Sequence, residues 1–141
     1  MTALDQLVRV HRWNLDEKRQ KLVALEQLRE RLSGNIATLD AELQHEKEVA
    51  ARSDVTSIAL PAFIRASLER RQKIEESIAE VDRSVAAARD EITEAFQELK
   101  KYETAHGNHQ RREAQKHSKR EQAVADEVGL ELHRRHAAGG N

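Results

Sequence analysis

The sequence predicts an all-α fold: a long antiparallel two-helix coiled-coil hairpin with a polar, less ordered C-terminal extension. Three observations carry this prediction. Charged residues make up 35% of the chain and aromatic residues only 3%, which is typical of long helices rather than of a globule with a thick core. Apolar residues recur at heptad spacing in two long segments. One proline lies between these segments, and only five glycines occur among the 141 residues. We expect a single domain.

The first predicted helix covers about residues 3–52. Ten of its fourteen a and d positions are apolar, which favours a coiled-coil seam. Arg29, Lys18 and Glu46 are charged at seam positions. They are expected either to reach the edge of the seam and fix its register, or to mark places where a partner lies against the hairpin. The a positions are Val8, Leu15, Leu22, Arg29, Ile36, Leu43 and Ala50, and the d positions are Leu4, His11, Lys18, Leu25, Leu32, Leu39 and Glu46.

Pro61 predicts the start of the second helix, because proline is tolerated in a first helical turn, where its missing N–H would have no partner. Residues 53–60 are therefore expected to form the turn, and the second helix to cover about residues 61–105. Eleven of its fourteen a and d positions are apolar. The a positions are Ile64, Arg71, Ile78, Val85, Ile92, Leu99 and His106, and the d positions are Leu60, Ser67, Ile74, Val81, Ala88, Ala95 and Tyr102.

The two seams are similar in length and joined by a short connection, which predicts that the helices pair antiparallel. The segment RDEITEAFQELKKYE, residues 89–103, then lies beside the start of the first helix. On this interpretation, Phe96, Leu99 and Tyr102 lie near Leu7, Val8 and Trp13.

The C-terminal extension lacks the seam. Residues 106–120, HGNHQRREAQKHSKR, carry five basic residues against Glu113, and their only apolar residue is Ala114. We expect the second helix to extend with weak order to about residue 134, to end in a frayed tail over residues 135–141, and to become ordered only with a partner. The apolar residues that return within the extension are Val124, Val128 and Leu132.

Composition excludes several classes of function. The 24 basic and 25 acidic residues nearly balance, which argues against nucleic acid as a partner. The chain has no cysteine, no signal-peptide pattern at its start and no run of 18 apolar residues, so we expect a cytoplasmic location. It also has no glycine-rich phosphate loop and no catalytic spacing. We therefore expect no enzymatic activity, no catalytic residues, no cofactor and no small-molecule substrate.

Histidines are the only residues whose spacing suggests a metal site. Two histidines three residues apart share one face of a helix, but without cysteine or a paired carboxylate they form a weak ligand set. We therefore expect solvated side chains and no metal. The two pairs are His106 with His109 and His133 with His136.

Apolar residues off the seam are candidates for binding a partner. Phe63 and Leu68 flank the predicted turn beside Ile64, and an apolar patch on a charged helix marks a binding site. Trp13 falls at the outward f position, where it is expected either to dock a partner or to cap the edge formed by Phe96 and Tyr102 or the returning C-terminal tail. The basic residues of the segment 106–120 are expected to be solvated or to dock a protein. They are Arg111, Arg112, Lys116, Lys119 and Arg120. The full candidate set is Phe63, Ile64, Leu68, Trp13, Phe96, Tyr102, Arg111 and Arg112.

Four segments resemble the FliJ family of flagellar export proteins, in particular its alphaproteobacterial form. The resemblance extends over residues 4–132, and its most specific pieces are AFQELKKYE and KREQAVADEVGL. The four segments are LVRVHRWNLDEKRQKL, FIRASLERR, RDEITEAFQELKKYE and KREQAVADEVGLEL.

The resemblance implies a non-enzymatic coupling component of the flagellar type III export apparatus, itself an antiparallel coiled-coil hairpin. It implies binding to the hexameric export ATPase through the helix ends, contact with the transmembrane export gate, binding of export chaperones, and peripheral association with the inner membrane. Phe63 and Ile64 match the family's gate-contacting Phe-Ile pair. Ser67, Arg70 and Ile74 depart from the family pattern, so gate contacts are implied for the pair alone.

Other functions remain open at this point. A generic coiled-coil adaptor and the stalk protein of a virulence-type secretion system have the same pattern of residues. A nucleic-acid-binding helical arm is disfavoured by the near-neutral charge. A prefoldin-like holding chaperone would require a β-hairpin segment for assembly, which the sequence does not predict.

Overall fold

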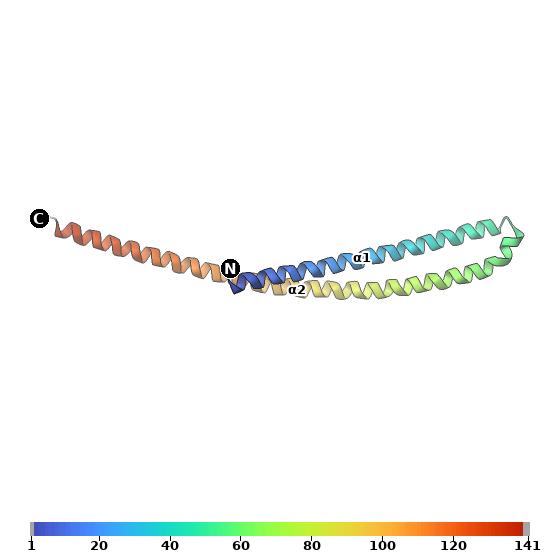
Figure 1. Cartoon of the computed structure of the whole chain (residues 1–141), viewed down its shortest axis with the longest axis horizontal. Coiled ribbons are helices and arrows are strands. Elements are labelled where there is room, and N and C mark those ends of the chain that lie inside the picture. Colours follow the sequence, from blue (N-terminus) through green and yellow to red (C-terminus); the bar gives the residue numbers. More distant parts are fainter. Residues whose placement is uncertain (1, 140–141) are drawn as a thin grey trace. The chain divides into compact units, whose positions relative to one another are not determined.

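The computed structural model describes residues 2–139, except for the side chains of residues 54–56. Within this range the helices are α1 (Ala3–Ala50) and α2 (Asp54–Ala138), and no strand occurs. The two helices lie side by side and run antiparallel, as Figure 1 shows. The predicted all-α helical hairpin is therefore confirmed. The contacts group the chain into two compact units, residues 13–96 and residues 1–12 with 97–141, and each has its own helix pairing.

In the unit of residues 13–96, the predicted seam lies between the helices. All its a and d positions are buried or half-buried except Arg29, which is exposed. Three seam residues on the α2 side are small, namely Ser67, Ala88 and Ala95, and all three are buried. The remaining buried seam residues of this unit are Leu15, Leu39, Ala50, Val81 and Val85.

In the unit of residues 1–12 and 97–141, pairing is short and is followed by a helix that nothing covers. Val8 and Leu99 are buried, and the half-buried residues continue along α2 to His109. Every described residue from 110 to 139 is exposed. We call residues 110–138 the uncovered helix. The pairing of the helices thus continues two layers beyond Tyr102. In these layers the half-buried residues of α2 include the polar side chains His106 and His109.

The predicted turn over residues 53–60 is wrong. Only residues 51–53 connect the helices, and α2 begins at Asp54, so Pro61 lies inside the helix. The carbonyl of Ser53 accepts the N–H of Ser57 at 3.2 Å, which makes Ser53 the N-cap residue. Serine is among the preferred N-caps, and this local preference starts the helix before the proline. The first turns of α2, drawn in green in Figure 1, lie at an angle to the rest of the helix, which is typical of a proline kink.

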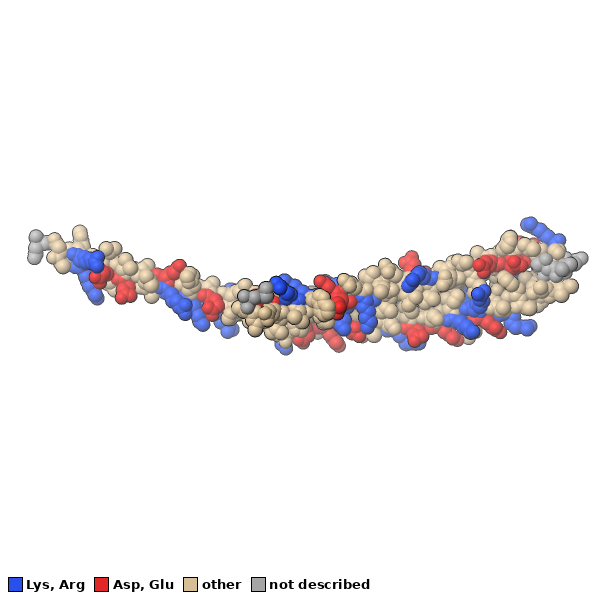
Figure 2. Space-filling view, in the orientation of Figure 1, with Lys and Arg blue, Asp and Glu red and all other residues tan. Residues whose placement is uncertain are grey.

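The other helix ends differ less from the prediction. α1 ends at Ala50, two residues before the predicted end, and α2 remains helical to Ala138, past the predicted limit of about residue 134. Residues 140 and 141 of the predicted frayed tail lie outside the described residues. In the described part of the chain, neither helix is apolar over a length that would cross a bilayer. Figure 2 shows basic and acidic side chains interspersed along the visible face of the paired helices.

Candidate partner-binding surfaces

Apolar side chains are exposed around the start of α2. We call these side chains together the tip surface and define it by Ile58, Phe63, Ile64 and Leu68. Ile58 is 84% exposed, Leu68 54% and Phe63 37%, whereas Ile64 is half-buried in the seam. No charged residue occurs between Asp54 and Arg65, although charged residues make up 35% of the chain. Exposed apolar side chains in an uncharged stretch are typical of a binding surface.

Ile58 was missed by reasoning from sequence. It falls in the stretch that was predicted to be the turn, where a single apolar residue carries little information. Because α2 already begins before it, Ile58 is a helical residue with its side chain in solvent. The lack of charge around it was the available clue.

The aromatic candidates divide into exposed and covered residues. Trp13 is 62% exposed and Phe96 44% exposed, both in the unit of residues 13–96. In the other unit, Tyr102 is half-buried and its ring stacks on His11, with centroids 4.5 Å apart and planes 17° apart. His11 therefore covers Tyr102, which agrees with the predicted pairing of this segment with the start of α1. Trp13 remains available to a partner.

The uncovered helix carries a narrow apolar stripe. Val124, Val128 and Leu132 follow one another at four-residue spacing, so they lie on one face, and each is more than half exposed. A shallow hollow beside them is also lined by Glu127, Glu131 and Arg135. The two basic candidates lie at the start of this helix, where Arg111 Nη2 donates to Asn108 Oδ1 at 3.0 Å and Arg112 is exposed.

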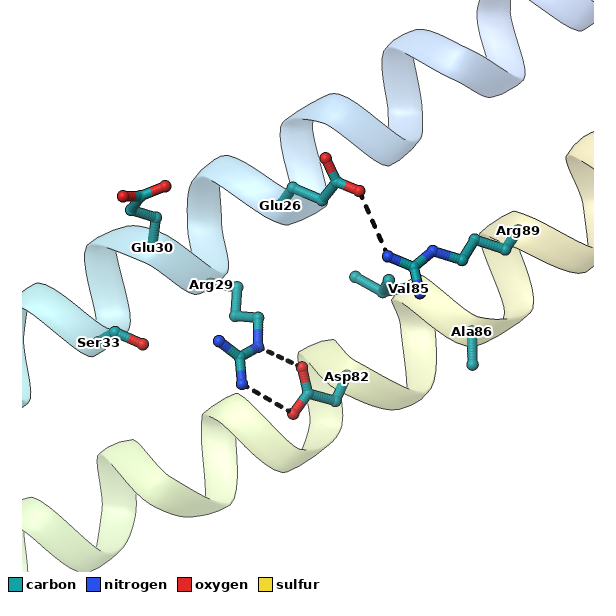
Figure 3. Close-up of a pocket in the computed structure, with 8 residues that line it drawn as sticks. All are labelled: Glu26, Arg29, Glu30, Ser33, Asp82, Val85, Ala86 and Arg89. Atoms are coloured by element: carbon teal, nitrogen blue, oxygen red, sulfur yellow. Dashed lines mark hydrogen bonds and ion pairs between the residues drawn. The ribbon is translucent and has the colours of Figure 1, made fainter.

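Charged residues line much of a groove between the helices in the unit of residues 13–96, and Arg29 is the one among them that occupies a seam position (Figure 3). Arg29 extends across the groove, and its Nε donates to Asp82 Oδ1 at 2.5 Å. Nearby, Arg89 pairs with Glu26 at 3.7 Å. Arg29 is exposed because it reaches sideways to this carboxylate, which supports its predicted role in fixing the register.

A second pair repeats this contact with the helices exchanged. Arg71 on α2 donates from Nε to Asp40 Oδ1 on α1 at 3.0 Å. Arg71 follows Arg29 by 42 residues, and Asp82 follows Asp40 by the same 42 residues. This separation equals six heptads. Both pairs form together in one alignment of the helices, so a shift of one heptad would break both. This is the arrangement expected of residues that specify register.

The two remaining charged seam residues of α1 are Lys18 and Glu46. Lys18 contacts Glu91 at 3.5 Å and Lys21 contacts the same carboxylate at 3.6 Å. The charge of Lys18, followed by that of Lys21, holds the pKa of Glu91 below its ordinary value. Glu46 is half-buried at its d position. Among the described residues, no three His, Asp or Glu side chains are grouped to hold a metal ion.

Asp40 gives this ion-pair system a dependence on pH. The hydrogen bond from Arg71 holds the pKa of Asp40 below its ordinary 3.8. A depressed carboxyl pKa stabilises the fold above the ordinary value, and this contribution is lost as the pH falls through the folded-state pKa. We therefore expect Asp40→Asn to lower the urea midpoint at about pH 7 and to have a smaller effect at about pH 2.5. Asp90→Asn, on the exposed f position of α2, is the control and should change neither midpoint. An equal loss at both pH values would show that Asp40 acts through packing.

The family comparison covers nearly the whole chain. The model of the flagellar FliJ protein family matches residues 1–138, which include both helices and the uncovered helix. No curated protein and no solved structure matches the sequence. The match agrees with the four segments that suggested this family, which lie at the start of α1, at the start and middle of α2 and in the uncovered helix. The chain therefore belongs to the flagellar FliJ protein family.

Proposed function

We propose that this protein is a non-enzymatic coupling protein of the flagellar type III export apparatus. It binds the export ATPase hexamer and the transmembrane export gate, and it receives export chaperones. The observation that carries this proposal is the presence of two exposed apolar surfaces with no residue in common, the tip surface and the stripe on the uncovered helix. A protein that joins two partners requires two such surfaces and no catalytic group.

The tip surface is the proposed site for the export gate. Phe63 and Ile64 correspond to the Phe-Ile pair of the family, and Phe63 supplies an aromatic ring of the kind that anchors interfaces. Ile58 adds the most exposed large apolar side chain of the described residues. Its truncation should weaken the same contact, since both side chains belong to the uncharged start of α2.

The uncovered helix is the proposed site for the export ATPase. Its stripe of Val124, Val128 and Leu132 has no partner within the described chain, and an isolated helix gains little stability in water. Binding in a protein ring would bury the stripe and order the helix. Arg111 and Arg112 at its start supply charge for the same contact. Trp13, the most exposed aromatic residue, is our candidate for contact with an export chaperone.

The proposed location follows from the proposed partners. A protein that binds a transmembrane gate and a cytoplasmic ATPase lies in the cytoplasm, in peripheral contact with the inner membrane. We propose that the protein belongs to the alphaproteobacterial form of the family, which its four segments resemble.

Truncating Phe63 tests the proposal at the tip surface. We expect Phe63→Ala to weaken binding to the purified cytoplasmic domain of the gate protein by roughly 1–3 kcal/mol, or about 5- to 150-fold in Kd, as for the loss of an aromatic anchor. Titration calorimetry measures this change directly. Phe96→Ala removes the same ring from another part of α2 and is the matched control, which should leave gate binding unchanged. Helical content and ATPase binding should not change in either variant.

One result would assign the partner surface differently. If Phe63→Ala leaves gate binding and motility intact, while charge reversal at Arg111 and Arg112 abolishes both, the gate binds the uncovered helix. The tip surface would then have another role.

A further inference from the structure

The N-terminus of α1 is closed by a reciprocal cap. The backbone N–H of Thr2 donates to Asp5 Oδ2 at 2.8 Å, and the Thr2 hydroxyl donates to the same oxygen at 3.0 Å. The N–H of Asp5 donates in return to Thr2 Oγ1 at 3.2 Å. These bonds satisfy donors that the first helical turn would otherwise leave unpaired. The hydrogen bonds from Thr2, with a smaller effect of His106, hold the pKa of Asp5 below its ordinary 3.8.

The same carboxylate reaches across to α2. Asp5 Oδ1 contacts His106 Nε2, and both side chains are half-buried. This contact joins the first turn of α1 to the a position that ends the predicted seam. Two turns further along α1, Arg12 pairs with Glu103 at 3.4 Å, and Lys100 also holds Glu103 at 3.1 Å. Among the described residues, Asp5 and His106 therefore form the polar contact between the helices that lies nearest the start of α1.

The surroundings of His106 contain both signs of charge. A hollow beside it is lined by Asp5, Val8, Arg9, Arg12 and His106. The charged and titratable groups that face His106 from α1 are thus Asp5, Arg9 and Arg12. On α2, Glu103 and His109 lie three residues to either side, and Glu103 is already held by Arg12 and Lys100. Asp5 is the carboxylate in direct contact with the imidazole.

We propose that Asp5 and His106 form a proton-dependent clasp that fastens the N-terminal turns of α1 to α2. With its second proton, His106 makes a charge-assisted bond to Asp5. Without that proton, the contact is at most a neutral–anion hydrogen bond and is weaker. Histidine is the side chain whose charge ordinarily changes between about pH 5 and 8, whereas the carboxylate of Asp5 stays ionised across that range. The clasp is therefore closed on the acid side of the histidine titration and loosens as the pH rises through it.

Opening the clasp has a defined structural consequence. Val8 and Leu99 are the buried apolar residues of this unit, and the pairing of the two helices covers them. When the clasp loosens, the start of α1 separates from α2 more often, and these side chains meet water. The pairing of the start of α1 with α2 therefore depends on pH, whereas apolar contacts in the seam do not.

Amide hydrogen exchange on the full-length protein tests the clasp. We expect protection of amides 6–12, corrected for intrinsic exchange, to be about two- to fivefold lower at about pH 8 than at about pH 5.5, the range for an exposed ion pair. His106→Gln should remove this dependence on pH. Asp5→Asn should also remove it, because the substitution removes the negative charge that His106 contacts. Asparagine can still form hydrogen bonds in the first helical turn, so the cap itself should be kept. His11→Phe keeps a ring against Tyr102 without a titratable group, and should retain the dependence.

Three outcomes would overturn the proposal. The first is equal protection of amides 6–12 at the two pH values in the unmodified protein. The second is a dependence on pH that persists in His106→Gln. The third is a dependence that disappears in His11→Phe, which would assign the titration to the stacked pair. A second readout is the chemical shift of the His106 ring, whose titration curve should change in Asp5→Asn and not in His117→Gln, a histidine of the uncovered helix.

Discussion

Leu15→Ala will destabilise the helix pair by about 2–5 kcal/mol, the range measured for buried leucines in protein cores. Leu15 is 3% exposed and lies at an a position of the seam. A two-helix seam is one layer of side chains thick, so few neighbouring groups are available to fill the space that the substitution leaves. We therefore expect the free energy of unfolding to fall by an amount in the upper half of this range.

Urea denaturation followed by circular dichroism at 222 nm measures the loss. Leu130→Ala makes the same chemical change at a residue that is 57% exposed on the uncovered helix, and should alter stability by less than about 0.5 kcal/mol. If the two variants lose equal stability, the seam is not what holds the helices together. A larger loss in Leu130→Ala would place a second core on the uncovered helix.

The seam was predictable because heptad spacing is a local property of the sequence. Leu15, Leu39 and Val85 are buried at positions that counting alone assigned. Arg29 departs from the pattern because its long side chain leaves the seam to reach Asp82. That contact depends on which residues of α2 lie opposite, and so on the alignment of the two helices. Counting within one helix cannot supply this alignment.

The start of α2 was not predictable by the same means. Pro61 and Ser53 each favour a helix start, and the sequence does not show which preference prevails. The structure starts the helix at Asp54 behind the Ser53 cap and accepts the kink at Pro61. As a result, Ile58 becomes an exposed helical residue and joins the tip surface. The error in one helix boundary therefore concealed a candidate site residue.

The contacts that end the seam depend on alignment as well. The sequence identified His106 as an a position and Asp5 as an ordinary acidic residue near the N-terminus. Their contact follows from the antiparallel pairing and from the three-residue connection, which is shorter than the predicted turn. Ionic contacts of this kind extend pairing beyond the last apolar layer, which a count of apolar residues does not register.

Amides of residues 112–134 will exchange at least about a hundredfold faster than those of residues 74–102, although both segments are helical in α2. The seam protects the second segment, where Val81, Val85 and Ala88 are buried. The uncovered helix has no buried side chain, so opening it exposes no apolar surface and is opposed by backbone hydrogen bonds alone. Native-state hydrogen exchange with mass spectrometry resolves the two segments in one experiment.

The proposed partner should reverse this difference. If the ATPase binds the stripe of Val124, Val128 and Leu132, adding the purified ATPase will slow exchange in residues 112–134 and leave residues 74–102 unchanged. Val128→Asp places a charge in the stripe and should prevent the slowing, whereas Gln122→Asp is a control outside the stripe. Slow exchange in the free protein would contradict the prediction, because it would require packing of the uncovered helix against a second copy of the chain. Since such packing would depend on protein concentration and the ATPase effect on added ATPase, dilution separates the two causes.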